Sequence, residues 1–111
     1  MINVLIVKSK QNIITVEATG HSGYAEQGKD IVCSAVSTLM QNLANGITEV
    51  IKANAKIVVD EEIPHLSVTL AEDDNNKCKY AQILMQTTIL SLKEIANGYS
   101  KYIKIKEKQN D

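Results

Sequence analysis

The sequence contains no arginine, phenylalanine or tryptophan, and only one proline and two cysteines among its 111 residues. Without arginine, the chain has no bidentate guanidinium group to hold phosphate or carboxylate. Its 12 lysines and 13 acidic residues leave a formal charge of −1, whereas dedicated nucleic-acid-binding proteins usually have a strongly basic surface. We therefore expect no direct nucleic-acid partner.

Long apolar runs and processing signals are also missing. No stretch approaches the ~20 apolar residues that span a bilayer. The start MINVLIVKSKQ lacks the basic region and the small-residue cleavage site of a signal peptide. Two cysteines in such a chain are more typical of free thiols than of a disulfide framework. Together these features predict a cytoplasmic protein with no membrane contact.

The hydrophobic pattern changes several times along the chain, and each change predicts an element. Runs of β-branched residues predict strands, whereas apolar residues spaced three and four apart predict helices. The predicted strands are residues 2–8, 13–18, 55–60, 66–71 and 102–106, and the predicted helices are residues 31–53 and 77–97. This ββαββαβ order predicts one α+β domain over residues 1–111, a mixed or antiparallel sheet with both helices packed on one face.

The second predicted helix has apolar residues on more than one face. Ile83, Met85, Ile89 and Leu90 widen its main stripe. Helix geometry alone favours a deeply buried helix, with a subunit contact as the alternative. In the first helix, Gly46 weakens the local structure and indicates a point of close packing.

A glycine-rich segment, residues 19–30, separates the second strand from the first helix. It is longer than most connections, and loops of that length tend to be functional or mobile. Asp30 stands at its end, where an N-cap is expected. Cys33 would then lie in the first helical turn, where free N–H groups and the helix dipole favour a thiolate.

The same segment contains a histidine that could act on this thiol. His21 could accept the proton of Cys33, and Asp30 could orient the imidazole as the third member of a triad does. The N–H of Cys33 and neighbouring loop amides could form an oxyanion hole. The alternatives are that Cys33 is a small apolar residue, that His21 is a surface residue and that Asp30 only caps the helix.

Cys78 and His65 are the remaining thiol and imidazole. Cys78 starts the second helix within a charged stretch, which indicates a structural or incidental role, and His65 follows Pro64 in a turn, which predicts a solvated loop residue. A metal site formed by these two residues with His21 and Cys33 would lack any close pair of ligands in the sequence. We therefore expect no metal and no other cofactor.

Two segments carry a resemblance to a known family. Gly20-His-Ser-Gly-Tyr24 and Gly28-Lys-Asp-Ile-Val-Cys-Ser-Ala-Val-Ser37 resemble the signature of the ribosomal-processing cysteine protease Prp family, a G-H-[SA] element followed by D-[IV]-[VI]-C-[SA]-A-[VI]-S. The length and the predicted order of elements also fit, so the resemblance extends over the whole chain.

The resemblance implies a cysteine endopeptidase that forms homodimers. Its substrate would be a bacterial ribosomal protein, the twenty-seventh of the large subunit, made with a short N-terminal extension that is removed for ribosome assembly. Cys33 would be the nucleophile and His21 the general base and proton donor, while Asp30 and Ser37 match motif positions with supporting roles. The loop residues that would shape the peptide groove are Gly20, Ser22, Gly23, Tyr24 and Gly28.

Two other functions remain open at this point. One is a non-enzymatic, ribosome-associated module that binds proteins with the same domain. The other is a thiol redox or acyl-transfer enzyme, although the lack of a C-x-x-C pair disfavours redox chemistry.

Overall fold

The computed structural model describes residues 1–26, 28–62 and 64–110. Its strands and helices follow one another in the predicted ββαββαβ order, with a short π-helical turn, η1, after the first helix. The elements are β1 (Ile2–Ser9), β2 (Asn12–Thr19), α1 (Ile31–Asn45), η1 (Gly46–Val50), β3 (Ala55–Asp60), β4 (His65–Leu70), α2 (Asn75–Gly98) and β5 (Ile103–Gln109).

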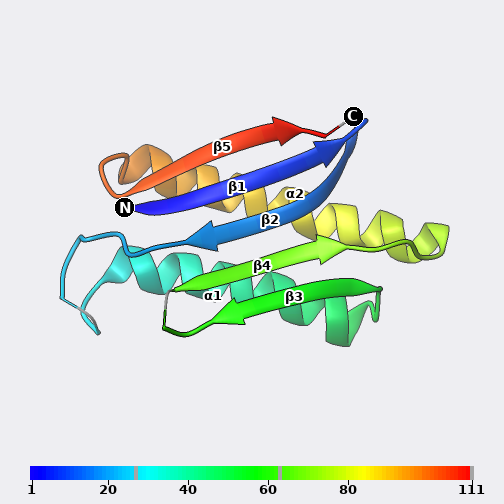
Figure 1. Ribbon diagram of the computed structural model, residues 1–111, viewed down its shortest axis with the longest axis horizontal. Helices are drawn as coiled ribbons and strands as arrows, with labels where there is room; N and C mark the ends of the chain where they lie inside the picture. Colours follow the sequence, from blue (N-terminus) through cyan, green and yellow to red (C-terminus); the bar gives the residue numbers. More distant parts are fainter. Residues whose placement is uncertain (27, 63, 111) are drawn as a thin grey trace.

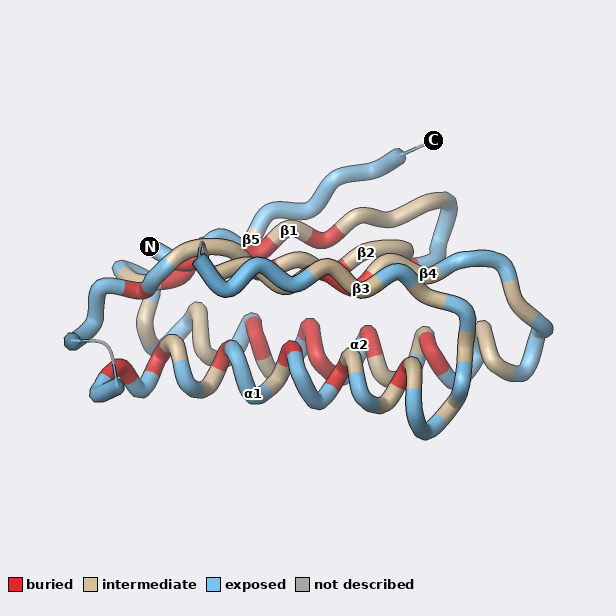
Figure 2. Tube along the Cα trace, turned by 60° about the horizontal axis from the view of Figure 1, so that its bottom comes forward, coloured by how far each residue is buried: buried red, intermediate tan, exposed pale blue. Residues whose placement is uncertain are grey.

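The five strands form one mixed sheet in the order β3-β4-β2-β1-β5 (Figure 1). The pairs β1–β2, β2–β4 and β3–β4 are antiparallel, and β5 joins β1 in parallel. A parallel neighbour requires a crossover connection, and α2 provides it between β4 and β5. Both helices pack on the same face of the sheet, which gives two layers (Figure 2). The predicted fold class is confirmed.

The core lies between these two layers because alternate strand residues and one stripe of each helix face each other. In register, Val4 of β1 pairs with Ala18 of β2, and Val16 of β2 pairs with Val68 of β4. The side chains most deeply buried in this layer are Val4, Ile6, Val16, Val32, Met40, Leu43, Ile47, Val68, Met85 and Leu92. No helix among the described residues is long and apolar enough to cross a membrane.

The first helix is shorter than the pattern predicts. It ends at Asn45 and continues as η1, rather than as a regular helix to residue 53. Gly46 begins this turn, and a Cβ placed on it would lie 2.7 Å from Cδ1 of Leu84 in α2. The close packing expected at Gly46 is therefore confirmed.

The second helix is buried on one face only. Ala81, Met85, Ile89 and Leu92 turn into the core, as the buried-helix interpretation requires. The opposite face exposes more than half of each of its large apolar side chains, which are Tyr80, Ile83 and Leu90. For that face the buried-helix interpretation is wrong, and an apolar stripe remains uncovered.

Candidate active site

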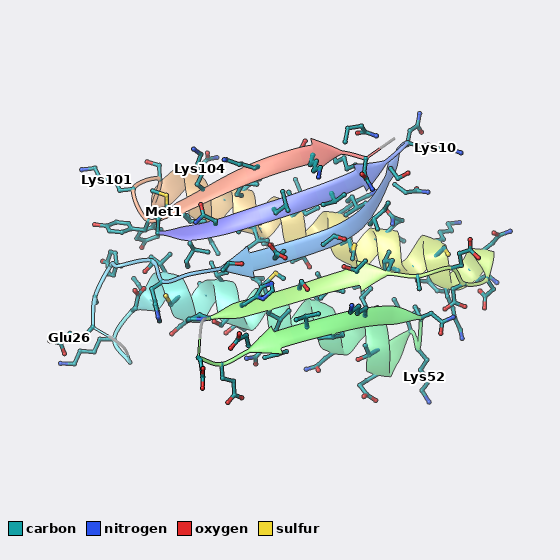
Figure 3. All side chains as sticks on the ribbon, in the orientation of Figure 1. Met1, Lys10, Glu26, Lys52, Lys101 and Lys104 are labelled. Atoms are coloured by element: carbon teal, nitrogen blue, oxygen red, sulfur yellow. The ribbon has the colours of Figure 1, made fainter. Side chains whose placement is uncertain are left out.

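The loop between β2 and α1, which contains His21 and Asp30, lies at one end of the molecule, beside the N-terminus and the β3–β4 turn (Figure 1). The loop projects from this end, with Glu26 at its outer part and Met1 beside its base (Figure 3). The N–H of Gly20 donates to the carbonyl of Pro64 at 2.8 Å, which ties the loop to the turn. Gly20 has a φ of +98°, and a Cβ there would lie 2.7 Å from the Met1 carbonyl oxygen, so only glycine fits.

Asp30 ends the loop and caps α1, as predicted. Its backbone is extended, with φ −84° and ψ 100°, and its Oδ1 accepts the N–H of Cys33 at 2.9 Å. This bond satisfies one of the free N–H groups at the start of the helix. It also places Cys33 in the first turn, at the end of the molecule where the loop lies.

The second oxygen of Asp30 holds the loop. Oδ2 accepts the hydroxyl hydrogen of Ser22. Burial raises the pKa of Asp30, but hydrogen bonds from the Ser22 hydroxyl, from Cys33 and from the Ala25 backbone outweigh it and lower the pKa to about 2. None of these bonds involves His21. In this structure the carboxylate therefore holds the helix and the loop, and not the imidazole.

One proposed part of the oxyanion hole is not free. The N–H of Cys33 already donates to Asp30, and the N–H of Ser34 donates to the Asp30 carbonyl at 3.1 Å. A donor that is already bound to a carboxylate is less available to a developing oxyanion. In this structure the Cys33 N–H, expected to contribute to an oxyanion hole, is bound to the Asp30 carboxylate.

Cys33 and His21 lie together between two hollows. The thiol is half-buried, and its Sγ accepts the backbone N–H of Ser22 at 3.3 Å. One hollow of about 290 Å³ and another of about 430 Å³ have three residues in common, namely His21, Cys33 and Ser37. The structure thus brings together the thiol, the imidazole and the hydroxyl that the sequence motif contains.

The two hollows differ in what lines them. Residues of β2, α1 and the β3–β4 hairpin surround the first, and its apolar residues are Ile2, Ala18, Val36, Met40, Val59, Pro64 and Leu66. Small loop and helix residues line the second, among them Gly23, Ala25, Gly28 and Ser34. The first suits an apolar side chain, and the second suits a backbone or a small side chain.

The remaining loop residues have separate positions. Ser22 is only 3% exposed, so it faces the protein and not the surface of a peptide groove. The ring of Tyr24 packs edge-to-face on Tyr99 and Tyr102, with centroids 5.6 Å and 5.2 Å apart. These two tyrosines lie between α2 and β5, and no local pattern in the sequence indicates their contact with the loop.

His65 and Cys78 belong to regular elements. The prediction of a solvated His65 in a turn is wrong, because His65 is the first residue of β4 and its Nε2 lies 3.1 Å from Oε2 of Glu17. It also contributes to the wall of the apolar hollow. Cys78 lies in α2, where its Sγ donates to the Asp73 carbonyl at 3.5 Å. The described residues contain no group of three or more His, Cys, Asp or Glu that could hold a metal ion.

The comparisons with known proteins agree on one family. The family model described as cysteine protease Prp matches residues 1–104. The ribosomal processing cysteine protease Prp of Staphylococcus aureus (strain Mu50 / ATCC 700699) is 28% identical over 109 residues, which are 97% of this chain and 100% of the relative. The protein of the same name from Bacillus subtilis (strain 168) is 26% identical over 107 residues, 95% of this chain and 96% of the relative.

A solved structure has the same fold. It is the essential ribosomal processing protease Prp from S. aureus, in complex with a covalently linked product peptide. It superposes with a TM-score of 0.87 at 28% identity, over 97% of this chain and 100% of that chain.

Proposed function

The chain belongs to the cysteine protease Prp family, and we propose that it removes the N-terminal extension of a large-subunit ribosomal protein, the twenty-seventh of that subunit. It is a cysteine protease by family. The choice of substrate rests on the motif resemblance and on the relatives' names, which describe ribosomal processing.

A single observation carries the assignment of the site. His21, Cys33 and Ser37 are the residues common to the two hollows. An extended peptide that occupies both hollows must cross this group, so its scissile carbonyl lies at the thiol. We assign Cys33 as the nucleophile and His21 as the base and proton donor, with Asp30 and Ser37 supporting them.

The chemistry is acyl transfer in two steps. His21 takes the proton of Cys33, and the thiolate attacks the scissile carbonyl. The imidazolium then gives its proton to the leaving amine, which leaves a thioester on Cys33. Water, deprotonated by His21, attacks the thioester and releases the acid. The dipole of α1 stabilises negative charge on the sulfur before attack.

The hollows also indicate which peptide is accepted. The apolar hollow beside Cys33 is large enough for one apolar side chain next to the scissile bond, and its burial supplies binding energy of about 25 cal/mol per Å² of apolar surface. The small residues around the second hollow let a peptide backbone approach closely. Such a site selects an extended segment with one bulky apolar residue.

The assembly and location follow from other features. The exposed stripe of Tyr80, Ile83 and Leu90 on α2 supports a homodimer, because apolar surface of this kind is stabilised by a partner. The substrate is a ribosomal protein, so the site of action is the cytoplasm.

Peptide cleavage tests the function. A peptide spanning the extension and the mature N-terminus is incubated with the wild type, Cys33→Ala and the matched control Cys78→Ala, and the products are identified by mass spectrometry. We expect one cut by the wild type and by Cys78→Ala. Cys33→Ala should lose at least ~10³-fold in rate, because removing a nucleophile leaves only binding and electrostatic terms.

The other outcomes are equally informative. Cleavage that survives Cys33→Ala would exclude Cys33 as the nucleophile. If the wild type binds the peptide but leaves it intact, the protein is the non-enzymatic binding module considered as the alternative.

A further inference from the structure

Ser22 is a buried polar residue in an exposed loop. It is 3% exposed, whereas its neighbours His21 and Gly23 are exposed. A buried hydroxyl is stable only when its hydrogen-bonding capacity is used. The Ser22 hydroxyl donates to Oδ2 of Asp30 and accepts the N–H of Tyr24 at 3.1 Å, so this side chain is held from two sides.

The backbone of Ser22 contacts the reacting atom. Its N–H donates to Sγ of Cys33 at 3.3 Å. A hydrogen bond strengthens when its acceptor becomes charged, so this donor favours the thiolate over the thiol. The Asp30 carboxylate nearby disfavours a second negative charge on the sulfur. The Ser22 N–H counteracts this effect.

The Asp30 carboxylate connects the Ser22 hydroxyl to the helical turn that carries Cys33. Asp30 takes the N–H of Cys33 on one oxygen and the hydroxyl of Ser22 on the other. The Asp30 side chain therefore fixes the distance between Ser22 and the first turn of α1. His21 directly precedes Ser22, so the same link limits where the imidazole can lie.

We propose that Ser22 is a positioning residue for the cleavage reaction: its hydroxyl, held by Asp30, keeps its backbone N–H on the sulfur of Cys33 and thereby favours the reactive thiolate. This inference rests on the proposed function of Cys33 as nucleophile. It assigns to Ser22 a role distinct from the expected one, since a residue buried under the loop does not form the surface of a peptide groove.

The test compares three serine variants in a Cys78→Ser background, in which only Cys33 can be alkylated. Ser22→Ala removes the hydroxyl and keeps the N–H, Ser22→Thr keeps both, and Ser100→Ala changes an exposed serine between α2 and β5. Each is measured for iodoacetamide alkylation rate against pH, and for kcat and KM on the peptide.

We expect Ser22→Ala to raise the pH midpoint of alkylation by about one unit, which corresponds to a tenfold change in the ionisation equilibrium. Its kcat should fall about tenfold with little change in KM, since the lost interaction acts on the nucleophile rather than on substrate binding. Ser22→Thr should recover most of both effects, and Ser100→Ala should match the parent.

A second measurement needs no substitution at Ser22. In the parent protein, the amide proton resonance of Ser22 should shift with pH at the same midpoint as Cys33 alkylation, and this shift should vanish in Cys33→Ala. The proposal would be overturned if a folded Ser22→Ala had an unchanged alkylation midpoint. It would also be overturned if the pH-dependent shift of the Ser22 amide resonance were the same in Cys33→Ala as in the parent.

These readouts also separate the proposal from the proposed function. If the parent protein fails to cleave the peptide, the proposed function fails. The alkylation midpoint and the amide shift still decide whether Ser22 controls the thiol.

Discussion

At the scale of single residues, Asp30 joins the start of α1 and the loop through one carboxylate. It caps α1 through Cys33, holds the loop through Ser22, and remains ionised because these donors outweigh the effect of burial. A neutral acid at this position would lose acceptor strength at both oxygens. The charge of Asp30 therefore contributes to stability as well as to the geometry of the site.

This charge predicts an acid-dependent loss of stability. The pKa of Asp30 is about 2 in the folded protein against 3.8 for the free side chain. A carboxylate whose pKa is lower in the folded state stabilises the folded protein. This stabilisation has its full value above the unfolded-state pKa and is lost as the pH falls through the folded-state pKa. The difference in free energy of unfolding between the wild type and Asp30→Asn should therefore be constant above about pH 5 and shrink towards pH 2.

Urea unfolding across this pH range measures that difference. Asp74→Asn is the matched control, because Asp74 caps α2 through the N–H of Lys77 from an exposed position, and asparagine caps a helix about as well as aspartate. It should stay within about 0.5 kcal/mol of the wild type at neutral pH. If the difference in free energy of unfolding between the wild type and Asp30→Asn is unchanged at pH 2.5, the charge of Asp30 does not have the role argued for it.

The sequence predicts the local part of the site better than its walls. The cap at Asp30, and with it the place of Cys33 in the first turn, depends on a few adjacent residues. The burial of Ser22 and the position of His65 depend on contacts across the fold. The apolar hollow needs the β3–β4 hairpin beside β2, and a single sequence does not specify that pairing.

At the scale of elements, the side chain of Gln82 hydrogen-bonds the backbone of β2 where that strand has no neighbour on one side. The pairing of β2 with β4 ends at Thr15 and Thr69, which leaves the backbone of Ile13 without a strand neighbour on that side. Gln82 of α2 accepts the N–H of Ile13 at 2.9 Å and donates to its carbonyl at 2.7 Å. One carboxamide thus pairs with one residue as an adjacent strand would, and it fastens α2 to the sheet.

Removing this carboxamide should destabilise the protein. We expect Gln82→Ala to cost about 1–2 kcal/mol, since each hydrogen bond contributes roughly 1 kcal/mol net and water partly replaces it at this half-buried site. Gln86→Ala, an exposed position one turn later, should cost less than about 0.5 kcal/mol. Urea unfolding of the two variants provides the comparison, and equal losses would show that the pairing with Ile13 is unimportant.

The kinds of elements were predictable, whereas their ends and neighbours were less so. The change from alternation to helical spacing specifies strands and helices from residues close in sequence. Where α1 ends, Gly46 packs closely against Leu84 of the other helix, a contact between residues far apart in the sequence. The parallel pairing of β5 with β1 joins residues about a hundred positions apart, and nothing local indicates it.

At the scale of the whole molecule, α2 exposes an apolar stripe on the side that faces away from the sheet. The helices cover one side of the sheet, and α2 turns Tyr80, Ile83 and Leu90 outward, exposed by 53%, 52% and 64%. At about 100° per residue, these positions fall within an arc of roughly 80°, so they form one stripe. Apolar residues on a single stripe of a surface helix are typical of an association surface.

The stripe predicts a homodimer that one substitution dissociates. Sedimentation of the wild type at micromolar concentration should give twice the chain mass of 12.2 kDa. Leu90→Lys should give the monomer mass, because a lysine buried within an apolar contact must lose its hydration without gaining a partner. Val50→Lys is the matched control: Val50 is 80% exposed and belongs to η1, not to α2, so this variant should remain dimeric. A dimer that persists in Leu90→Lys, or that dissociates equally in both variants, would place the subunit contact elsewhere on the molecule.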